Sequence, residues 1–419
     1  MKKIALLSFV VIFALISVNV TAVAEEKVEI EFWTILLADA FGDYINGMID
    51  EYEAANPNVE IKWYDTGEPI TEYMTSLASG NPPDVANMHH PRDFAARGVI
   101  WNLDELLTEE QQDTYIDNLY LYGEGEYEGG HYAIPWYGGS ASGMFYNREI
   151  FEAAGLDPDQ PPKTTKEMYE FANIIAKNTD KYGLSWDTCG WHEQHVIDVL
   201  VWEDVELLNE DKTEAVINNP KAVDVLNTLI ESYEVGGIPP EAVSSSGRDT
   251  LNWFLEERTA MFVQGGWIKR YISDDLMEKI EYVKVPLGRD GSRVTGTPNW
   301  IIISKASEHP EIAADFATFV TNTENQVEFC KLVAITPTTK DALEDPFFQQ
   351  EPENFNQLAQ QLAIEQLQED VPQNMLIPQA ENWAEMLTIL KEEVDRALIG
   401  NQTTEETLEN VERRWNSLL

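Results

Sequence analysis

The stretch from Ala133 to Asn147 reads AIPWYGGSASGMFYN and places Trp136 and Tyr137 directly before a small, flexible Gly/Ser run. Indole and phenol rings offer flat apolar faces with a polar tip, which suits stacking on the C–H faces of a sugar. The chain contains 12 Trp and 16 Tyr, so most of these rings must pack in hydrophobic cores. Two interpretations of Trp136 and Tyr137 therefore stay open, a binding platform and ordinary core packing.

Polar candidates follow the predicted strands. His89 and Arg92 stand in MHHPR, directly after a strand-like run over 84–88, and Asp39 lies beyond the first strand. Because α/β sheets bind ligands at the carboxyl ends of their strands, these side chains are candidate partners for ligand hydroxyls, with a solvated loop as the alternative. Among the many acids we favour Asp39 and Asp187, the latter in SWD.

Two other classes of protein use the same residue types. A secreted glycoside hydrolase needs a pair of carboxylates, but no spacing here singles out an acid and a nucleophile. GGSASG does not match the G-x-S-x-G of a serine hydrolase. The segment from His192 to His195, HEQH, is one residue short of the zinc motif H-E-x-x-H, and no third ligand is indicated. We therefore expect a protein that is not an enzyme and binds no metal or cofactor.

The charge is strongly negative: 28 Lys and Arg stand against 74 Asp and Glu, a formal net charge of −46. Such a surface repels nucleic acid and anionic lipid, which excludes both as partners. A hydrophobic content of 43% is too high for a disordered acidic chain, so the charge belongs to a folded surface. It serves either general solubility or adaptation to a saline exterior, and we favour the second.

The first residues resemble a secretory signal peptide. Lys2 and Lys3 precede an unbroken apolar run and the small-residue pattern Ala22-Val23-Ala24, which predicts cleavage after Ala24. The first cysteine is Cys189, so the cleavage point lacks the Cys that a lipid anchor needs. No later segment has about 18 consecutive apolar residues. We expect an exported, unanchored protein, most useful in a periplasm.

Strand and helix patterns alternate after the leader. Strand-like runs occur at 28–34, 59–64 and 84–88, with helical runs at 41–55 and 70–78 between them. This order predicts βαβ units and a largely parallel sheet. A helix starts after Pro161-Pro162 with Thr164 or Thr165 as N-cap. Further strand-like runs lie at 260–263, 283–285 and 300–303, and the chain after Pro310 is nearly all helical, ending with a long amphipathic run over 380–398.

Several segments together resemble family 1 of the bacterial extracellular solute-binding proteins, the maltose- and sugar-binding class that serves ABC importers. They include EFWT, YEAANPNVEIKW, ASGNPPDV, FLEERTAMFVQGGW, SEHPEIAADFATFVTN and IPQAENWAEML, in the family's order and over most of the mature chain. The resemblance implies a two-lobed α/β periplasmic-binding-protein fold with the ligand between the lobes. We expect one lobe to comprise 25–145 and 296–340, and the other 146–295 and 341–419.

The resemblance also implies a carbohydrate ligand, lobe closure and delivery to the permease subunits of an ABC transporter by a monomer. Further aromatics then fall on expected ligand positions: Trp191, Trp267, Trp300 and Trp383. Where maltose-binding relatives carry an aromatic residue and an acid, this chain has Met88 and Pro91, which argues against maltodextrin. A polyol, a sugar phosphate or a cation stays open as the ligand. Because they fall in different predicted lobes, we expect Cys189 and Cys330 to be free thiols.

Overall fold

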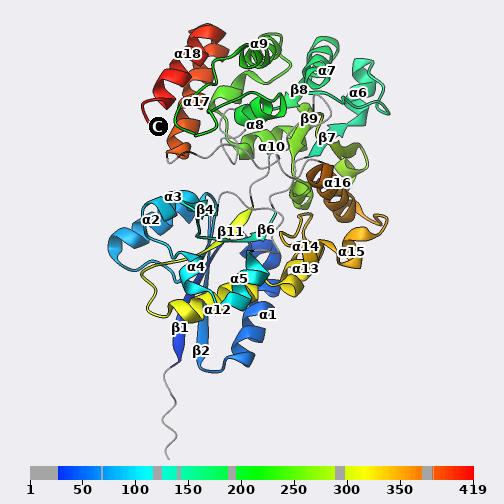
Figure 1. Ribbon diagram of the computed structural model, residues 1–419. Helices are drawn as coiled ribbons and strands as arrows, with labels where there is room; N and C mark the ends of the chain where they lie inside the picture. Colours follow the sequence, from blue (N-terminus) through cyan, green and yellow to red (C-terminus); the bar gives the residue numbers. More distant parts are fainter. Residues whose placement is uncertain are drawn as a thin grey trace, which may run out of the picture.

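The computed structural model describes residues 27–67, 69–116, 125–138, 143–186, 195–287, 298–369, 380 and 382–419. The chain forms two α/β lobes, drawn one above the other in Figure 1, and each lobe has a sheet of its own. This arrangement confirms the two-lobed α/β fold that the sequence predicted. Over the described residues, no helix is both long and apolar enough to cross a membrane.

The first lobe contains a five-stranded sheet of order β2-β1-β3-β11-β6. Its strands are β1 (Val28–Ile35), β2 (Val59–Thr66), β3 (Val85–Met88), β6 (Ile134–Tyr137) and β11 (Asn299–Ile303). β1 pairs in parallel with β2 and β3, as the alternation of strands and helices predicted, whereas β11 runs antiparallel to β3 and β6. The carboxyl ends of the three parallel strands therefore share one edge, which faces the second lobe (Figure 1).

The second lobe contains a four-stranded sheet of order β10-β7-β9-β8. Its strands are β7 (Gly143–Asn147), β8 (Tyr182–Ser185), β9 (Thr259–Gln264) and β10 (Ile280–Lys284). β7 pairs antiparallel with both β9 and β10, and β8 pairs in parallel with β9. The chain thus passes between the lobes twice in strand-to-strand steps, from β6 to β7 and from β10 to β11.

Helices cover the first-lobe sheet. α1 buries Ile45, Met48, Ile49 and Tyr52, a spacing that puts all four on one face of the helix. The helices of this lobe are α1 (Ala38–Ala55), α2 (Pro69–Ser79), α3 (Pro91–Ala96), α4 (Leu103–Leu106), α5 (Glu109–Tyr115), α12 (Pro310–Val320), α13 (Thr323–Leu332), α14 (Lys340–Leu343) and α15 (Pro346–Gln349). A two-stranded ribbon, β4 (Glu126–Tyr127) and β5 (Gly130–His131), lies beside them.

The helices of the second lobe follow local start signals. Thr164 is the N-cap of α7 and accepts a hydrogen bond from the backbone N–H of Glu167, which confirms one of the two predicted caps. The helices are α6 (Arg148–Ala154), α7 (Thr165–Asn178), α8 (His195–Trp202), α9 (Pro220–Glu234), η1 (Pro240–Ser244), α10 (Gly247–Leu255), η2 (Gly266–Tyr271), α11 (Asp274–Met277), α17 (Trp383–Leu398) and α18 (Thr404–Trp415). η1 and η2 are 3₁₀ helices.

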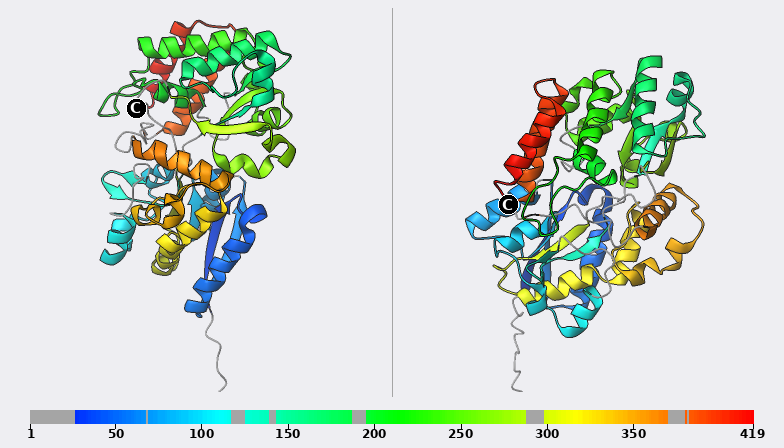
Figure 2. Two further views of the ribbon diagram at one scale, coloured as in Figure 1. Left: turned by 90° about the vertical axis from the view of Figure 1, so that its right-hand side faces the viewer. Right: turned by 45° about the horizontal axis from the view of Figure 1, so that its top comes forward.

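α16 (Phe355–Glu369) contacts both lobes. It packs against β7, β10 and η2 of the second lobe, and Glu365 forms an ion pair with Lys284 at 2.9 Å. On the other side the buried Gln360 amide donates hydrogen bonds to the carbonyls of Val333 (3.0 Å) and Ile335 (2.9 Å), which follow α13. Figure 2 shows the helix where the lobes meet. α16 is thus a structural link besides the two strand passages.

α14 and α15 belong to the core of the first lobe, to which they contribute Ala342 and Phe348. Both helices extend past residue 340, the predicted limit of this part of the first lobe. α14 packs against α13, and Lys331 of α13 lies over the Phe347 ring of α15 at 5.8 Å. The other predicted lobe limits stay predictions.

Candidate functional site at the lobe boundary

The candidate site starts where the parallel strands of the first lobe end. α1 begins directly after β1, and its first turn is capped by Asp65 from the end of β2. The Asp65 carboxylate accepts hydrogen bonds from the backbone N–H groups of Leu37 and Ala38, both at 3.0 Å, and from the Thr34 hydroxyl at 2.6 Å. A carboxylate suits this position because the helix dipole is positive there. The cap holds the α1 terminus against the sheet edge.

A hollow of about 550 Å³ lies along the first turns of α1. Its lining includes Asp39, Phe41, Asp43, Trp63 and Leu332. Asp39 is exposed, so its carboxylate is available to solvent and to a ligand hydroxyl. The structure therefore places this predicted residue on an open surface at the carboxyl end of β1.

The second lobe faces α1 with η2. The Arg270 guanidinium lies over three rings, those of Trp267 (5.3 Å) and Tyr271 (4.9 Å) in η2 and that of Phe41 (5.9 Å) in α1. Half-buried Trp267 packs against hydrophobic clusters of both lobes. Of the tryptophans that the sequence singled out and the structure describes, Trp267 is the one that bridges the two lobes.

Gly266 explains how η2 reaches this position. A Cβ built on Gly266 would lie 2.5 Å from the Cβ of Ala359 in α16 and 3.1 Å from that of Ala334, distances too short for ordinary contact. Glycine therefore permits the close approach of η2 to α16. The next residue, Trp267, is directed to the lobe boundary by this packing.

Arg92 contributes a second contact region. It is the second residue of α3, whose N-cap His90 has a left-handed backbone with φ of 52°. Arg92 donates a hydrogen bond to the carbonyl of Glu126 at 3.0 Å and lies over the Tyr127 ring at 5.6 Å. Lys212 of the second lobe is close by: burial lowers its pKa, the Arg92 charge lowers it further, and Glu126 opposes both effects. Positive groups from the two lobes thus meet here.

His89 lies beside His90, with ring centroids 6.4 Å apart. Both histidines are half-buried at the carboxyl end of β3. The sequence predicted one loop for His89 and Arg92, whereas the structure places His89 after β3 and Arg92 in helix α3. Direct contact of either residue with a ligand stays a prediction.

Trp136 and Tyr137 lie inside the first lobe. The Trp136 ring is fully buried and stacks on Phe329, with centroids 5.4 Å apart and planes at 17°. Tyr137 is 8% exposed and meets the same phenylalanine edge-on. Burial raises the pKa of the Tyr137 hydroxyl; the charge of Arg270 opposes this shift and that of Asp65 adds to it. Trp136 is therefore packed in the core, whereas the Tyr137 hydroxyl is close enough to Arg270 for that positive charge to affect its pKa.

Trp300 and Trp383 also lie in cores. Trp300 is fully buried in a first-lobe cluster with Met88 and Phe94, and Trp383 is 3% exposed beside Trp415, with centroids 5.7 Å apart. In this arrangement neither ring presents a face to a ligand. Their role as stacking platforms stays a prediction, and the observed packing favours the alternative.

Several predicted positions lie outside the described residues. These are Asp187, Trp191, Cys189 and the first three residues of the HEQH segment. The described residues contain no group of three or more His, Cys, Asp or Glu side chains arranged to hold a metal ion. Cys330, by contrast, is described and is a buried free thiol.

Sequence reasoning missed Arg270, Phe41, Tyr271 and Lys212 as residues of the lobe boundary. Arg270 follows Trp267 by one 3₁₀ turn in GGWIKRY, which was the available local signal. Phe41 and Arg270 come from distant parts of the chain, and only the folded arrangement brings their side chains together.

Comparison with known proteins agrees with the two-lobed fold. Residues 38–327 match the family described as bacterial extracellular solute-binding protein. A periplasmic-binding protein from Synechococcus sp. MITs9220 has the same fold, with a TM-score of 0.82, 22% identity, and coverage of 93% of this chain and 98% of that chain. An ABC transporter solute-binding protein from Thermotoga lettingae bound with α-D-tagatose has a TM-score of 0.77, 20% identity, and coverage of 94% and 100%.

A curated relative has a different ligand in its name. The sn-glycerol-3-phosphate-binding periplasmic protein UgpB of Escherichia coli K12 is 22% identical over 429 residues, covering 94% of this chain and 93% of its own. The two-lobed α/β fold is the one that this chain shares with these solute-binding proteins. The family match spans more than half of the chain, so this protein belongs to the bacterial extracellular solute-binding protein family.

Proposed function

We propose that this protein is the extracytoplasmic substrate-binding component of an ABC importer and binds a sugar or short oligosaccharide by closure of its two lobes. Membership of the solute-binding family supports the binding role, and the tagatose complex of a protein with the same fold supports a sugar. The observation that carries the proposal is the position of the Arg270 guanidinium, which lies over the ring of Trp267 in the second lobe and over that of Phe41 in the first. A ligand held there touches both lobes, so its binding free energy favours the closed form.

The chemistry of the boundary fits a polyhydroxylated ligand. Trp267 supplies an aromatic face, exposed Asp39 supplies an acceptor, and Arg270 supplies donors. We expect the protein to work as a monomer in the periplasm, to deliver its ligand to permease subunits, and to lack catalytic activity. The family is one of binding proteins rather than enzymes, which supports the last point.

The test is a ligand screen followed by two matched tryptophan variants. Mono- and oligosaccharides are screened by thermal shift, and hits are titrated by intrinsic tryptophan fluorescence and calorimetry. Trp267→Ala should weaken binding by about 1–3 kcal/mol, or about ten- to hundredfold, because the ligand loses a stacking face.

Trp101→Ala is the matched control. Trp101 is also a half-buried tryptophan with a cation over its ring, Lys305 at 5.8 Å, but it packs against the first-lobe core alone. We expect this control to lose stability and keep its affinity. Equal losses of affinity in both variants, or a protein that releases sugar from glycans, would contradict the proposal.

A further inference from the structure

Arg270 is an exposed cation with no acidic partner in the described part of the chain. Its guanidinium is bordered by the rings of Phe41, Trp267 and Tyr271 at 4.9 to 5.9 Å, and no described carboxylate lies within ion-pair distance. Rings on several sides limit its rotamers and remove part of its water. The guanidinium is thus held in place while its hydrogen-bonding groups lack an anion.

The lack of a partner is notable because acids outnumber basic residues 74 to 28. Four described arginines form ion pairs with carboxylates within 4.0 Å: Arg148, Arg258, Arg396 and Arg414. Arg148 even pairs with two, Asp159 and Glu281. Arg92, Arg97 and Arg413 have no ion pair in the described part of the chain either, but of these arginines Arg270 is the one whose guanidinium lies over rings of both lobes.

Arg270 also lies where the two lobes meet, so an anion bound to it contacts both lobes. Arg270 lies in η2 of the second lobe, whereas the Phe41 ring beneath it belongs to the first lobe. Tyr137 also belongs to the first lobe; burial raises the pKa of its hydroxyl, and the charge of Arg270 opposes this shift. The N-terminus of α1 is not the competing anion site, because the Asp65 carboxylate already accepts its first N–H groups. The Arg270 guanidinium lies over the ring of Phe41, which lines this hollow, and it can pair with an anion there.

A second pair of positive groups, Arg92 and Lys212, also lies at the lobe boundary. Burial lowers the pKa of Lys212 in the second lobe, the charge of Arg92 in the first lobe lowers it further, and the charge of Glu126 opposes both effects. Like charges brought together across a boundary repel each other, and an anion between the lobes offsets that repulsion.

We propose that the natural ligand is an anionic sugar, a polyhydroxylated molecule with a carboxylate or phosphate group, and that Arg270 binds the anion. The inference rests on the proposed function and specifies its ligand class. A guanidinium matches both anions with two parallel hydrogen bonds. The curated relative UgpB, which matches this chain over 93% of its own length, is named for binding sn-glycerol 3-phosphate, a phosphorylated polyol.

The experiment compares matched ligand pairs on the mature protein by calorimetry, at about 0.15 M salt, where the Debye length is about 8 Å. The carboxylate arm uses glucuronate against glucose and digalacturonate against galactobiose. The phosphate arm uses glucose 1-phosphate against glucose and sn-glycerol 3-phosphate against glycerol. Tighter binding of the anionic member in either arm, by at least about tenfold, is expected, and the arm that responds identifies the anion.

Variants then assign the preference to a residue. Arg270→Gln should lower affinity for the anionic member by about ten- to hundredfold and affinity for the neutral member by a clearly smaller factor, because the neutral sugar loses hydrogen-bond donors but no ion pair. Arg270→Lys should recover part of the loss, since lysine keeps the charge but not the planar fork. Arg413→Gln is the charge-matched control, because Arg413 is exposed on α18 and bonded only to the Asn410 side chain.

The outcomes separate the two proposals. Equal or tighter binding of the neutral sugar by the wild type overturns the anionic ligand and leaves sugar binding intact. Equal losses in Arg270→Gln and Arg413→Gln overturn the role of Arg270. Binding of neither member of any pair overturns the proposed function and this inference together. The wild-type comparison does not depend on whether Arg270→Gln folds.

Discussion

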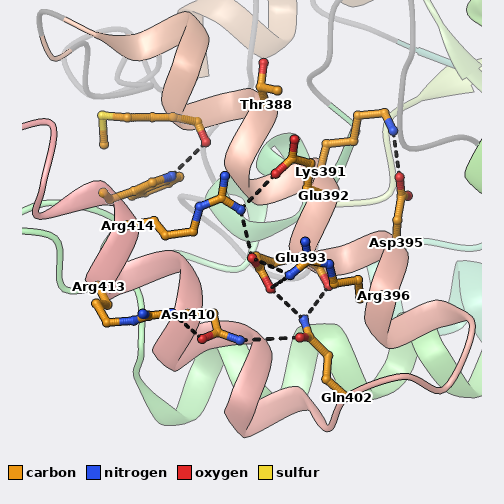
Figure 3. Close-up of polar contacts among 12 residues, drawn as sticks. Thr388, Lys391, Glu392, Glu393, Asp395, Arg396, Gln402, Asn410, Arg413 and Arg414 are labelled. Atoms are coloured by element: carbon orange, nitrogen blue, oxygen red, sulfur yellow. Dashed lines mark hydrogen bonds and ion pairs between the residues drawn. The ribbon is translucent and has the colours of Figure 1, made fainter.

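We predict that the ion-pair network between α17 and α18 is energetically asymmetric, with Arg414 more costly to remove than Glu393 (Figure 3). The Glu393 carboxylate is 1% exposed and accepts hydrogen bonds from Arg414 (2.8 Å), Gln402 (3.0 Å) and Arg396 (3.2 Å). Arg414 has one-third of its side chain exposed and keeps a second carboxylate, Glu392, at 2.8 Å. Without Glu393 the arginine still has water and a partner, whereas without Arg414 the carboxylate stays buried with longer contacts.

The magnitudes follow from this difference in burial. Removing one partner of a buried ion pair costs about 3–5 kcal/mol, and we expect Arg414→Gln to fall in this range because it leaves Glu393 buried and charged. Glu393→Gln keeps the shape and leaves a partly hydrated cation, so we expect about 1–3 kcal/mol. The double variant should be less destabilised than Arg414→Gln alone, since the buried charge is gone.

The assay is equilibrium unfolding in urea at neutral pH, with Arg413→Gln as the control for loss of an exposed arginine on the same helix. A Glu393→Gln variant at least as unstable as Arg414→Gln would refute the reasoning. So would a double variant whose loss of stability equals the sum of the two single losses.

The pH dependence gives a second readout of the same network. Burial raises the pKa of Glu393, but the hydrogen bonds from Arg414 and Gln402 and the charge of Arg396 outweigh it, so the pKa lies below its ordinary value. A lowered carboxyl pKa contributes stability that is present above about pH 4.3, the ordinary value, and is lost as the pH falls through the lowered one. The stability difference between wild type and Glu393→Gln should therefore shrink as the pH falls below about 4.3.

Three further outcomes are expected from the charge and burial of the chain. Without Lys2 and Lys3 the net charge is −48, so the surface repels itself at low salt. The Debye length falls from about 30 Å at 0.01 M salt to about 3 Å at 1 M. Between these two salt concentrations the melting temperature should therefore rise more than that of a near-neutral protein of similar size. Trp383→Ala should cost about 3–5 kcal/mol of stability and leave ligand affinity unchanged, and a normally stable variant with weakened binding would instead support the stacking role. Burial raises the pKa of the Cys330 thiol, so thiol reagents should label it only after denaturant is added, and labelling in the native state would contradict its placement.

The sequence by itself determined the features that depend on neighbours in the chain. The alternation of strand and helix patterns predicted β1, α1, β2, α2 and β3 in order, because side-chain period and cap residues are local properties. The α7 cap and the long α17 helix were predictable for the same reason. The net charge of −46 is likewise a property of composition and needs no fold.

Only the tertiary structure decided which aromatic rings are core and which face the lobe boundary. Trp136, Trp267 and Trp383 were all candidate ligand-binding residues in the sequence, yet Phe329 packs on the first, Trp415 packs beside the third, and Trp267 lies between two cores. The same holds for Arg270, whose ring contact with Phe41 joins distant segments. Burial and charge pairing depend on what packs against a side chain from elsewhere in the chain, so sequence spacing could nominate these residues but could not assign their roles.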